Sequence, residues 1–513
     1  MDLINEYGIC LDFKHKIIKF GNDQISMINM CDPNQALINN VNLLKITSHE
    51  IDDQLSKILT EVEKKNPEIG MVTTEPYEIE LNNQDEIINS KPYPIPFALD
   101  KAVKEEVKRL LKLGIIREST SKYSSPAFAI QKKTGGIRLV VNYKRLNKLT
   151  KTDSYPCNNI NNCLHSLRGT QIYSQIDLKN GFFQIPLKLE SQKYTSFVLP
   201  QGQFEYTRLC FGLKNSPRAF QKAMNQLLGH LSYVKLYLDD ILIASKNEKE
   251  HIEHIKEVFD ILIKSGASIN LEKSSFMKPE VEYLGMKISK NGIEPVVTKV
   301  EEYLNLPPPK TKKQLMRIIG VLNWFRPFVK RLSQKIAKIT DKLKEDNNFI
   351  WTKDDSAIVS EIFTEIKQGM TLGYPDYNKE FVLYTDASLI GIGSILIQNN
   401  RTIGLYSYKF KDAEQRYNTM EREFLGIYLS LLHFKQIIYN SKTIIYTDNK
   451  NLIYEPLNSV KRVQNWKLLL SEFNYELRYF PGKENVVADD LSRNFKIASY
   501  TQRQFIDINN INE

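Results

Sequence analysis

Two adjacent carboxylates, Asp239 and Asp240, interrupt an apolar stretch that runs from Val234 to Ser245. The stretch otherwise has the composition of a buried hairpin. Adjacent buried aspartates repel each other and are costly to desolvate, so a cation is needed to compensate them. Asp is also common in ordinary turns, and Tyr-Leu-Asp-Asp taken alone supports a turn and a divalent-metal site about equally. The surrounding sequence decides between them.

A third carboxylate lies upstream. A predicted strand ends at Asp177, and Phe182 lies in the Gly-aromatic segment that follows it. Residues 211–221, Phe-Gly-Leu-Lys-Asn-Ser-Pro-Arg-Ala-Phe-Gln, form a loop that leads into a helical pattern. These motifs, in this order, resemble those of the reverse transcriptases of gypsy-type LTR retrotransposons. The resemblance implies a polymerase palm that brings Asp177 to Asp239 and Asp240.

A basic segment with the character of a β-hairpin precedes the palm motifs. Residues 132–147 include Lys133 and Arg138, whose charges would neutralise the triphosphate of an incoming nucleotide. A solvated charged turn is the other interpretation. The segment resembles the fingers of the same family, although the family usually has Asp where this chain has Asn142 and Arg where it has Lys144.

The resemblance extends to residues that would surround the nucleotide and the primer end. It implies that Phe182 stacks under the sugar and excludes a 2′-hydroxyl, and that Phe211 contacts the nucleotide. A later palm motif ends at Lys273, which the resemblance places near the pyrophosphate. The expected residues of the primer grip are Tyr283, Leu284 and Gly285.

A second set of carboxylates lies in the last third of the chain. Two strand-like runs end at Asp386 and Asp448, and two helical patterns carry further acidic residues. A strand, helix, strand and helix that each carry an acidic group form the arrangement of a ribonuclease H domain, in which carboxylates hold two metal ions. Each acidic residue alone is more typical of a cap or turn, but the ordered set favours the nuclease.

Each of the two helical patterns offers a choice of acidic residue. Periodicity does not choose between Glu421 and Glu423, because they flank the apolar stripe on opposite sides at similar angles. The resemblance selects Glu423, which precedes Phe-Leu-Gly-Ile, and Asp489, which follows Asn-Val-Val-Ala. Glu421 and Asp490 are then expected to have no catalytic role.

The net charge of +10 is unevenly distributed. Residues 310–345 hold eleven Lys and Arg residues against two acidic ones, have helical apolar spacing, and resemble the thumb and connecting region of the family. A template-primer duplex is the natural partner, bound mainly through its phosphates, whereas a solvated helix face is the alternative. The residues expected to contact template-primer are Arg326, Lys330, Arg331 and Lys335.

The predicted fold class is a multidomain α+β and α/β protein: a right-hand polymerase with fingers, palm and thumb, followed by a ribonuclease H-like mixed-sheet domain. Its 513 residues suffice for three or four domains. The start weakly resembles the last strands of a retroviral aspartic protease, without its Asp-Thr-Gly or Asp-Ser-Gly motif. The expected boundaries are 1–30 for this remnant, 31–75 for a linker, 76–290 for fingers and palm, 291–372 for thumb and connecting region, 373–495 for the ribonuclease H domain, and 496–513 for a tail. We expect an internal piece of a Pol polyprotein.

Composition excludes several other classes of protein. The five cysteines lack zinc-site spacing, so neither a disulfide framework nor a metal knuckle is predicted. No apolar run approaches the roughly 20 residues of a membrane helix, and no membrane partner is expected. We expect an intracellular protein, and the resemblance implies the cytoplasm, in a virus-like particle, or the nucleus.

The expected activity is that of an RNA-directed DNA polymerase, also able to copy DNA, with ribonuclease H activity on RNA–DNA hybrids. The implied cofactors are two Mg²⁺ ions per active site, with Mn²⁺ as the alternative ion. The implied partners are an RNA template, a DNA or tRNA primer, RNA–DNA hybrid and dNTPs, with a second copy of the chain or other Pol fragments as protein partners.

Two other functions compete with this interpretation. A catalytically idle nucleic-acid-binding remnant would need no intact carboxylates, yet all seven expected positions carry one. An RNA polymerase that copies RNA shares the paired-aspartate hairpin, but it does not explain the second acidic set.

Overall fold

The computed structural model of the chain describes residues 9–12, 17–20, 23–26, 36–83, 85–132, 135–156, 159–304, 306–344, 349–453 and 461–480, with side chains from residue 51 onward, apart from that of residue 451. The chain divides into two compact units. Unit 1 contains residues 1–155, 176–234 and 247–275, and unit 2 contains residues 156–175, 235–246 and 276–513.

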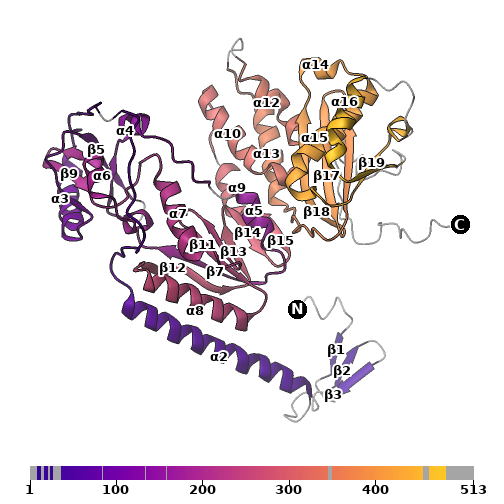
Figure 1. Ribbon diagram of the computed structural model, residues 1–513. Helices are drawn as coiled ribbons and strands as arrows, with labels where there is room; N and C mark the ends of the chain where they lie inside the picture. The colour runs from indigo at the N-terminus through magenta and orange to yellow at the C-terminus, as the bar shows by residue number, and fades with distance from the viewer. Residues whose placement is uncertain are drawn as a thin grey trace. The chain divides into compact units, whose positions relative to one another are not determined.

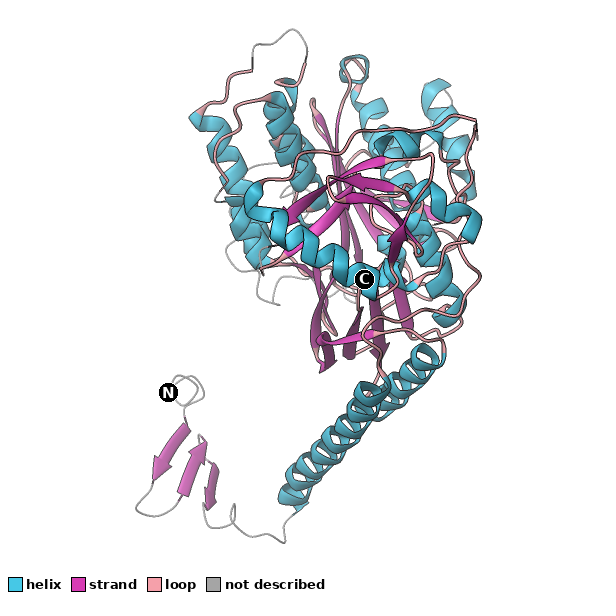
Figure 2. Cartoon of the chain, turned by 90° about the vertical axis from the view of Figure 1, so that its left-hand side faces the viewer, coloured by secondary structure: helices cyan, strands magenta, loops and turns pink. Residues whose placement is uncertain are grey.

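Unit 1 begins with a small antiparallel sheet and a long helix. The sheet has the order β1 (Ile9–Asp12), β2 (Ile17–Phe20) and β3 (Asp23–Ser26). Helix α2 (Ala36–Lys65) runs alongside α8 (Glu248–Lys264) and buries Val62 (Figure 2). The segment expected as a linker therefore contains a helix of 30 residues. Ile51, Leu55, Ile58 and Val62 recur at helical spacing on its less exposed side, so the sequence carries a helical pattern that the linker assignment overlooked.

The five-stranded sheet of unit 1 has the order β4-β9-β8-β5-β6. Its strands are β4 (Ile116–Glu118), β5 (Ser125–Gln131), β6 (Ile137–Val141), β8 (Phe197–Leu199) and β9 (Gly202–Tyr206). Strands β5 and β6 pair antiparallel, which confirms the predicted basic hairpin. Helix α3 (Phe97–Lys112) buries Val103, Val107 and Leu110 on one face. It begins just after Pro96.

Helix α7 (Ser216–Leu228) follows the Gly- and Pro-punctuated loop, as predicted. Pro217 lies in its first turn, where the missing N–H costs no helical hydrogen bond. Phe220, Met224 and Leu228 recur at helical spacing and are buried. The remaining short elements of this unit are α4 (Lys144–Leu149), η2 (Gly181–Gln184), α6 (Leu189–Gln192) and η3 (Lys193–Thr195).

A four-stranded sheet has the order β10-β11-β7-β12. Its strands are β7 (Ile172–Leu178), β10 (Val234–Tyr237), β11 (Asp240–Ser245) and β12 (Ile269–Lys278), and the division between the units falls inside β7 and β12. Strand β11 has five consecutive buried residues after Asp240, as expected for a central strand.

The first part of unit 2 contains an antiparallel sheet and a group of helices. The sheet has the order β13 (Glu280–Tyr283), β14 (Met286–Ser289) and β15 (Gly292–Pro295). Its core includes Tyr283, Ile288, Leu322, Phe325 and Phe363. The helices are α5 (Ile160–His165), α9 (Val297–Leu304), α10 (Lys312–Trp324), η4 (Arg326–Phe328), α11 (Leu332–Lys335), α12 (Ala337–Asp341) and α13 (Lys353–Lys367).

A mixed sheet of order β18-β17-β16-β19-β20 forms the second part of unit 2 (Figure 1). Its strands are β16 (Phe381–Ala387), β17 (Gly391–Gln398), β18 (Arg401–Lys409), β19 (Thr443–Thr447) and β20 (Tyr475–Tyr479). Phe424, Ile427 and Leu431 of α15 (Thr419–Ile438) pack against Phe381 and Leu383. The other helices are α14 (Asp412–Gln415), η5 (Lys450–Leu452), α16 (Lys461–Leu469) and η6 (Leu470–Glu472).

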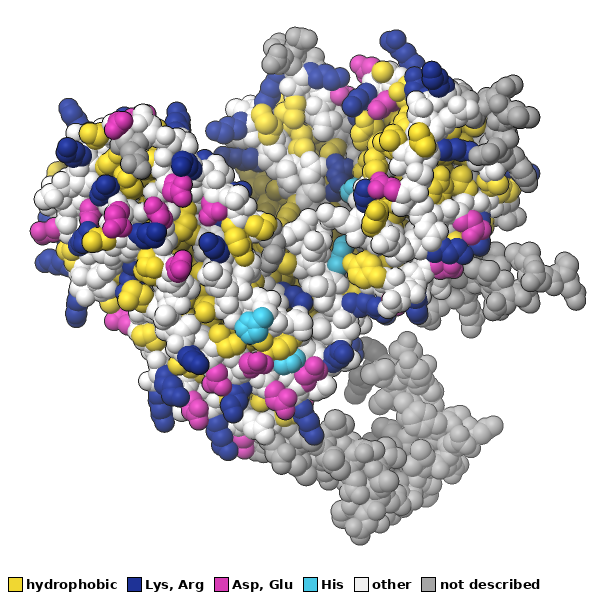
Figure 3. Space-filling view, in the orientation of Figure 1, with side chains coloured by type: hydrophobic (Ala, Val, Ile, Leu, Met, Phe, Trp, Pro, Cys, Tyr) yellow, Lys and Arg dark blue, Asp and Glu magenta, His cyan; other side chains and the backbone are white. Residues whose placement is uncertain are grey.

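The described structure bears on the expected duplex partner and on the expected absence of a membrane partner. On the face shown in Figure 3, basic and acidic side chains are interspersed rather than gathered in one basic band. This face therefore offers no continuous basic band to a duplex. None of the helices in the described ranges combines the length and apolar character needed to cross a bilayer.

Candidate active sites

The paired aspartates lie at the hairpin between β10 and β11. Leu238 and Asp239 form its two-residue turn, and Asp240 is the first residue of β11. Leu238 has a φ of 51°, a left-handed conformation that residues other than glycine rarely adopt. Strained backbone of this kind persists where the surrounding structure holds it and is frequent at functional sites.

Asp240 is partly buried and contacts β7. Gln175 Nε2 donates a hydrogen bond to Asp240 Oδ1 at 3.3 Å. Burial raises the pKa of Asp240, and the Gln175 hydrogen bond and the charge of Lys299 oppose that rise. Gln175 and Asp177 are two positions apart on β7, so their side chains project from the same face of the strand. The backbone N–H of Asp177 donates to Ser274 Oγ at 3.1 Å.

Sequence reasoning did not single out Gln175. The signal that would have found it is its position two residues before a strand-end aspartate, since the period of a strand is two. Its amide then lies on the face that carries the expected metal ligand.

Three of the residues expected around the nucleotide form a row in unit 1. The Arg138 guanidinium carbon lies 5.8 Å from the ring centroid of Phe211, within cation–π range. The ring centroids of Phe211 and Phe182 are 4.8 Å apart, and Phe182 also meets Phe220 edge-on at 5.5 Å. Phe182 is 8% exposed and Phe211 is 40% exposed. Lys133 lies outside the described residues.

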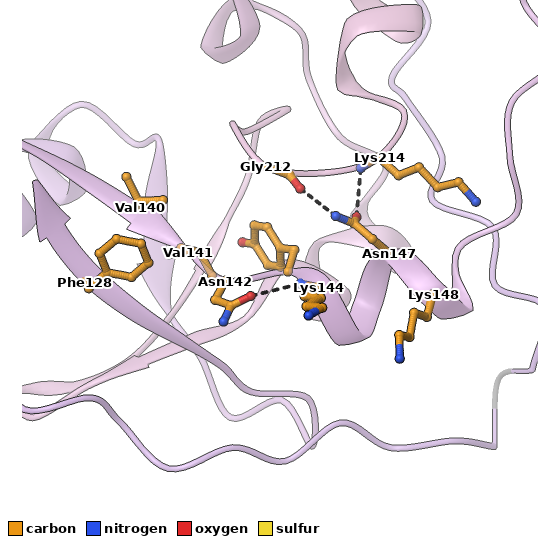
Figure 4. A pocket seen from close by; sticks show the side chains of 10 residues that line it. Phe128, Val140, Val141, Asn142, Lys144, Asn147, Lys148, Gly212 and Lys214 are labelled. Atoms are coloured by element: carbon orange, nitrogen blue, oxygen red, sulfur yellow. Dashed lines mark hydrogen bonds between the residues drawn. The ribbon is translucent and has the colours of Figure 1, made fainter. Parts of the chain in front are cut away.

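A hollow of about 610 Å³ lies between β6, α4 and the loop after Phe211 (Figure 4). Asn147 Nδ2 donates to the Gly212 carbonyl at 2.8 Å, and the backbone N–H of Lys214 donates to Asn147 Oδ1 at 2.8 Å. These two hydrogen bonds fix the loop against α4. The exposed ring of Phe128 lines the hollow together with three lysines. They are Lys144, Lys148 and Lys214.

The expected primer-grip residues lie at the turn between β13 and β14. Tyr283 pairs with Met286 across the turn, and Leu284 and Gly285 have φ values of 51° and 74°. Two central residues with positive φ define the tight type I′ turn. A Cβ added at Gly285 would lie 3.6 Å from Trp324 Cζ2. Trp324, the last residue of α10, therefore covers this turn. Lys273 is exposed on β12.

Helix α10 lies within the basic segment 310–345 and presents an exposed face whose residues are not among the four expected duplex contacts. Five exposed residues lie on one side of the helix, as their spacing requires. They are Lys313, Met316, Arg317, Gly320 and Trp324. A Cβ added at Gly320 would have no atom within 4 Å. The missing side chain leaves an opening in the middle of this face.

Two of the arginines expected to contact template-primer bind within unit 2. Arg326 Nη1 donates to Ser333 Oγ at 2.7 Å and to the Ser407 carbonyl at 3.0 Å, and burial lowers its pKa. Arg331 Nη2 lies 3.4 Å from Asp386 Oδ2. Both guanidinium groups therefore contact the ribonuclease H-like sheet.

The two lysines expected beside them meet one glutamate. The side chain of Lys335 forms an ion pair with Glu365 of α13, and the backbone N–H of Lys330 donates to Glu365 Oε1 at 3.2 Å. Contact of Arg326, Lys330, Arg331 and Lys335 with a duplex stays a prediction. Each of these residues has a partner within the protein.

Asp386 and Asp448 lie at neighbouring strand ends. Strands β16 and β19 run parallel, with Tyr384 opposite Tyr446. Each aspartate follows its tyrosine by two residues, so the two carboxylates reach the same edge of the sheet. Glu423, on α15, is 6% exposed. The helix that carries Glu423 packs against β16.

Burial raises the pKa of Glu423 to about 9, and the negative charges of Asp386 and Asp448 add to the rise. The backbone N–H of Ala387 and the charge of Arg422 oppose it. A carboxyl group responds to other carboxylates only when they lie nearby. The structure therefore places Glu423 within electrostatic range of Asp386 and Asp448.

Glu421 has structural partners instead. Its carboxylate accepts the backbone N–H of Asn418 at 3.0 Å, and Asn418 Oδ1 accepts the backbone N–H of Glu421 at 2.8 Å. These reciprocal bonds form the capping box of α15. Glu421 also forms an ion pair with Arg462. Asp489 and Asp490 lie outside the described residues.

The donor atoms of the nuclease cluster suit a hard divalent cation. All three are carboxyl groups, whose oxygen atoms are ligands that Mg²⁺ prefers, and the cations Arg331 and Arg422 lie near them. In the part of the chain that the structure describes, no three acidic, His or Cys side chains meet in the geometry of a formed metal site.

Two parts of the chain match known domain families. Residues 130–288 match the reverse transcriptase (RNA-dependent DNA polymerase) family, and residues 376–473 match the RNase H-like domain found in reverse transcriptase. Members of both families are generally dependent on divalent metal ions. The first match contains the β10–β11 turn, and the second contains Asp386, Glu423 and Asp448.

The Tf2-3 and Tf2-7 transposon polyproteins of Schizosaccharomyces pombe are each 34% identical to this chain over 434 residues, which is 81% of the chain and 32% of each relative. The chain thus spans about a third of the length of the curated relatives that it matches.

Among solved structures, the foamy viral protease-reverse transcriptase dRH in complex with double-stranded DNA has a TM-score of 0.78 at 24% identity, covering 84% of this chain and 79% of that one. The same viral protein in complex with RNA/DNA hybrid has a TM-score of 0.73 at 23% identity, covering 89% and 63%. These likenesses establish the fold.

The fold and the two family matches define a reverse transcriptase joined to an RNase H-like domain, which confirms the predicted right-hand polymerase and mixed-sheet domain. These are the domains of a nucleotidyltransferase and a nuclease. The chain belongs with the Pol polyproteins of gypsy-type LTR retrotransposons, as the motifs predicted.

Proposed function

We propose that this chain copies RNA into DNA, copies DNA as well, and cleaves the RNA strand of RNA–DNA hybrids during replication of an LTR retrotransposon. The observation that carries the proposal is that the chain has two separate sets of acidic side chains, each at the strand ends of a different sheet. One is Asp239 with Asp240 at the β10–β11 turn, and the other is Asp386 with Glu423 and Asp448. Each group offers the oxygen ligands that two-metal phosphoryl transfer uses.

In the polymerase site, Asp177, Asp239 and Asp240 would hold two Mg²⁺ ions, with Mn²⁺ as the alternative. The metals would lower the pKa of the primer 3′-hydroxyl and neutralise the triphosphate. The hydrogen bond from Gln175 orients the Asp240 carboxylate. Because burial makes the charged form of Asp240 costly, a bound cation is favoured there.

In the nuclease site, Asp386, Glu423, Asp448 and Asp489 would hold a second pair of metal ions. The support is that Asp386 and Asp448 lie at the ends of neighbouring parallel strands and that both act electrostatically on Glu423. Glu421 is excluded from this role because it caps α15 and pairs with Arg462.

The row of Arg138, Phe211 and Phe182 supports a nucleotide site. Arg138 and Lys133 would face the triphosphate, and the partly exposed ring of Phe211 would contact the nucleotide. Phe182 would lie against the sugar, where its packing against Phe211 and Phe220 makes it a rigid barrier to a 2′-hydroxyl. Lys273 would meet the pyrophosphate, and the turn at residues 283–285 would hold the primer end.

The exposed face of α10 supports a template-primer duplex as partner. The bare backbone at Gly320 would let the duplex approach the helix closely, with Met316 and Trp324 as apolar contacts on either side. Lys313 and Arg317 would neutralise phosphates. Arg326, Lys330, Arg331 and Lys335 are the weaker candidates, because each already has partners within unit 2.

We also propose a domain organisation, a cellular location and partners for the chain. Fingers and palm would occupy residues 76–290, the thumb and connecting region 291–372, and the ribonuclease H domain 373–495, with a protease remnant at 1–30. The chain would use a DNA or tRNA primer and dNTPs, and would act in a cytoplasmic virus-like particle or the nucleus. A second copy or another Pol fragment would be its protein partner.

The direct test uses the purified chain with a labelled DNA primer on an RNA template, dNTPs and Mg²⁺. Extension of the primer and shortening of the RNA within the hybrid are the expected results, and chelation of the metal should stop both. Tight binding of the hybrid with neither extension nor cleavage in Mg²⁺ or Mn²⁺ would instead identify an idle nucleic-acid-binding remnant.

A further inference from the structure

Arg331 meets the nuclease carboxylates from outside the ribonuclease H-like sheet. It lies between η4 and α11, about 50 residues before the sheet begins, yet its Nη2 atom is 3.4 Å from Asp386 Oδ2. The two side chains are 21% and 20% exposed, so solvent screens the pair only in part. No comparison or motif assigns a role to this contact.

The backbone around Arg331 is held in place from both sides. Arg331 has a φ of 53°, which costs conformational energy for a residue with a Cβ. The backbone N–H of Ser333 donates to Ser407 Oγ at 3.0 Å, and Gln334 Nε2 donates to the Ile392 carbonyl at 2.9 Å. These bonds anchor α11 to β18 and β17. The Arg331 guanidinium therefore lies beside Asp386 on a backbone that is hydrogen-bonded to the sheet.

The charges around Asp386 indicate how the Arg331 guanidinium affects metal binding by this carboxylate. Asp448 lies at the end of the neighbouring strand and Glu423 lies within electrostatic range, while Arg331 and Arg422 are cations close to this group. Arg422 also donates to the Ser388 carbonyl at 3.4 Å. A carboxylate that is paired with a guanidinium is a poorer ligand for a divalent cation, because the metal must displace or share the pair.

We propose that the Arg331 guanidinium holds the Asp386 carboxylate while no metal is bound and gives it up when metal binds, so that the segment from η4 to α12 sets how readily the nuclease site takes up metal. This inference rests on the proposed nuclease function. Arg331 is then a positioning residue, because it acts through Asp386 and not on the substrate.

The test is calorimetric titration with Mg²⁺ alone of the full chain, in a background with Asp239→Asn and Asp240→Asn to weaken the polymerase site. Arg331→Gln should tighten Mg²⁺ binding about three- to fivefold, the range expected for a partly exposed ion pair. It should also lower the melting temperature of the metal-free chain, since the carboxylates lose a compensating charge. Arg331→Lys should stay close to the parent.

Two further variants keep the result interpretable. Arg331→Asn removes the charge with a residue that tolerates positive φ, so it should fold and tighten binding even if the Gln variant does not fold. Lys409→Gln removes an ion pair with Asp341, at 2.9 Å, that ties the same segment to β18, and it should leave Mg²⁺ affinity unchanged.

Asp386→Asn separates the two possible failures. If it leaves Mg²⁺ binding unaltered, the proposed nuclease site is wrong and the inference falls with it. If it weakens binding while the charge-removing variants at Arg331 bind Mg²⁺ no more tightly than the parent, the nuclease site stands and the role given to Arg331 is overturned. Tighter binding in both Lys409→Gln and Arg331→Gln would also overturn it, because loosening of the segment would then be the cause.

Discussion

The indole of Trp324 lies against the turn at Gly285, with Cζ2 3.6 Å from the position that a Cβ on Gly285 would take. The end of α10 and the expected primer grip are thus neighbours within unit 2. The exposed face of α10 continues from Trp324 through Gly320 to Lys313, so a duplex whose primer end lies at the turn would run along this helix.

Two substitutions at Gly320 test its effect on stability and its effect on duplex binding separately. Because its Cβ position is open and lies on an exposed helix, Gly320→Ala should stabilise the protein by roughly 0.5–1 kcal/mol. Gly320→Leu should also fold, but should weaken template-primer binding because the side chain fills the opening. Thermal melts and fluorescence anisotropy with a labelled duplex measure the two effects. Undiminished affinity in the Leu variant would remove α10 from the interface.

The basic residues of α10 should act through counterion release. Replacing Lys313 and Arg317 by Gln should reduce the slope of log affinity against log salt by about two, since each phosphate contact contributes about 0.9. Lys335→Gln is the matched control: it removes a charge paired with Glu365 and should alter stability more than slope. Anisotropy titrations over a series of salt concentrations give the slopes, and equal slopes for all three proteins would assign the α10 charges to solvent.

Phe182 should discriminate against ribonucleotides. Phe182→Val removes the ring that packs on Phe211 and should raise ribonucleotide incorporation relative to deoxynucleotide. Its stability cost should stay below the roughly 3–5 kcal/mol of a Phe-to-Ala change in a core. Phe183→Leu, on the same turn, removes a ring that stacks on Tyr206 and meets Phe211 edge-on, and it should change the ratio less than Phe182→Val. Single-nucleotide extension assays measure the ratio, and an unaltered ratio in active Phe182→Val would refute the assignment.

The metal-free chain should lose stability as the pH rises. The pKa of Glu423 is about 9 in the folded protein against an ordinary value of 4.5, so between these values the folded state holds a proton that the unfolded state has released. Stability therefore falls as pH rises through that window. Glu423→Gln should flatten the dependence and raise the melting temperature near pH 8. Melts in chelator at several pH values test this.

Glu421→Gln provides the comparison. It weakens the capping box of α15 and the pair with Arg462, so it should cost about 1 kcal/mol at every pH while the slope with pH remains. A pH slope that survives in Glu423→Gln and disappears in Glu421→Gln would exchange the roles given to the two residues.

The sequence was sufficient where function follows from local order. Asp239 and Asp240 at a hairpin, Asp386 and Asp448 at strand ends, and the helix that carries Glu423 all have local signatures in period and punctuation. The choice between Glu421 and Glu423 could not come from periodicity, because both flank the apolar stripe. The partners Asn418, Asp386 and Asp448 distinguish them.

Contacts between distant segments were beyond the sequence. The excess of Lys and Arg in residues 310–345 indicated a duplex-binding surface, but charge counts do not reveal which cations meet carboxylates elsewhere. Arg331 and Lys335 contact Asp386 and Glu365, 55 and 30 residues away in sequence. Helix α2 was assigned to a linker although its second half carries an apolar stripe, and the surface of α8 that covers this stripe depends on tertiary structure.

The central claim, that one chain holds two independent metal-dependent active sites, is tested most directly by paired assays on Asp239→Asn and Asp386→Asn. Primer extension on an RNA template and cleavage of a preformed RNA–DNA hybrid are measured for each purified, folded variant. Asp239→Asn should abolish DNA synthesis and retain RNA cleavage, and Asp386→Asn should do the reverse, because the two sites use different carboxylates. Loss of both activities in either folded variant would contradict separate sites.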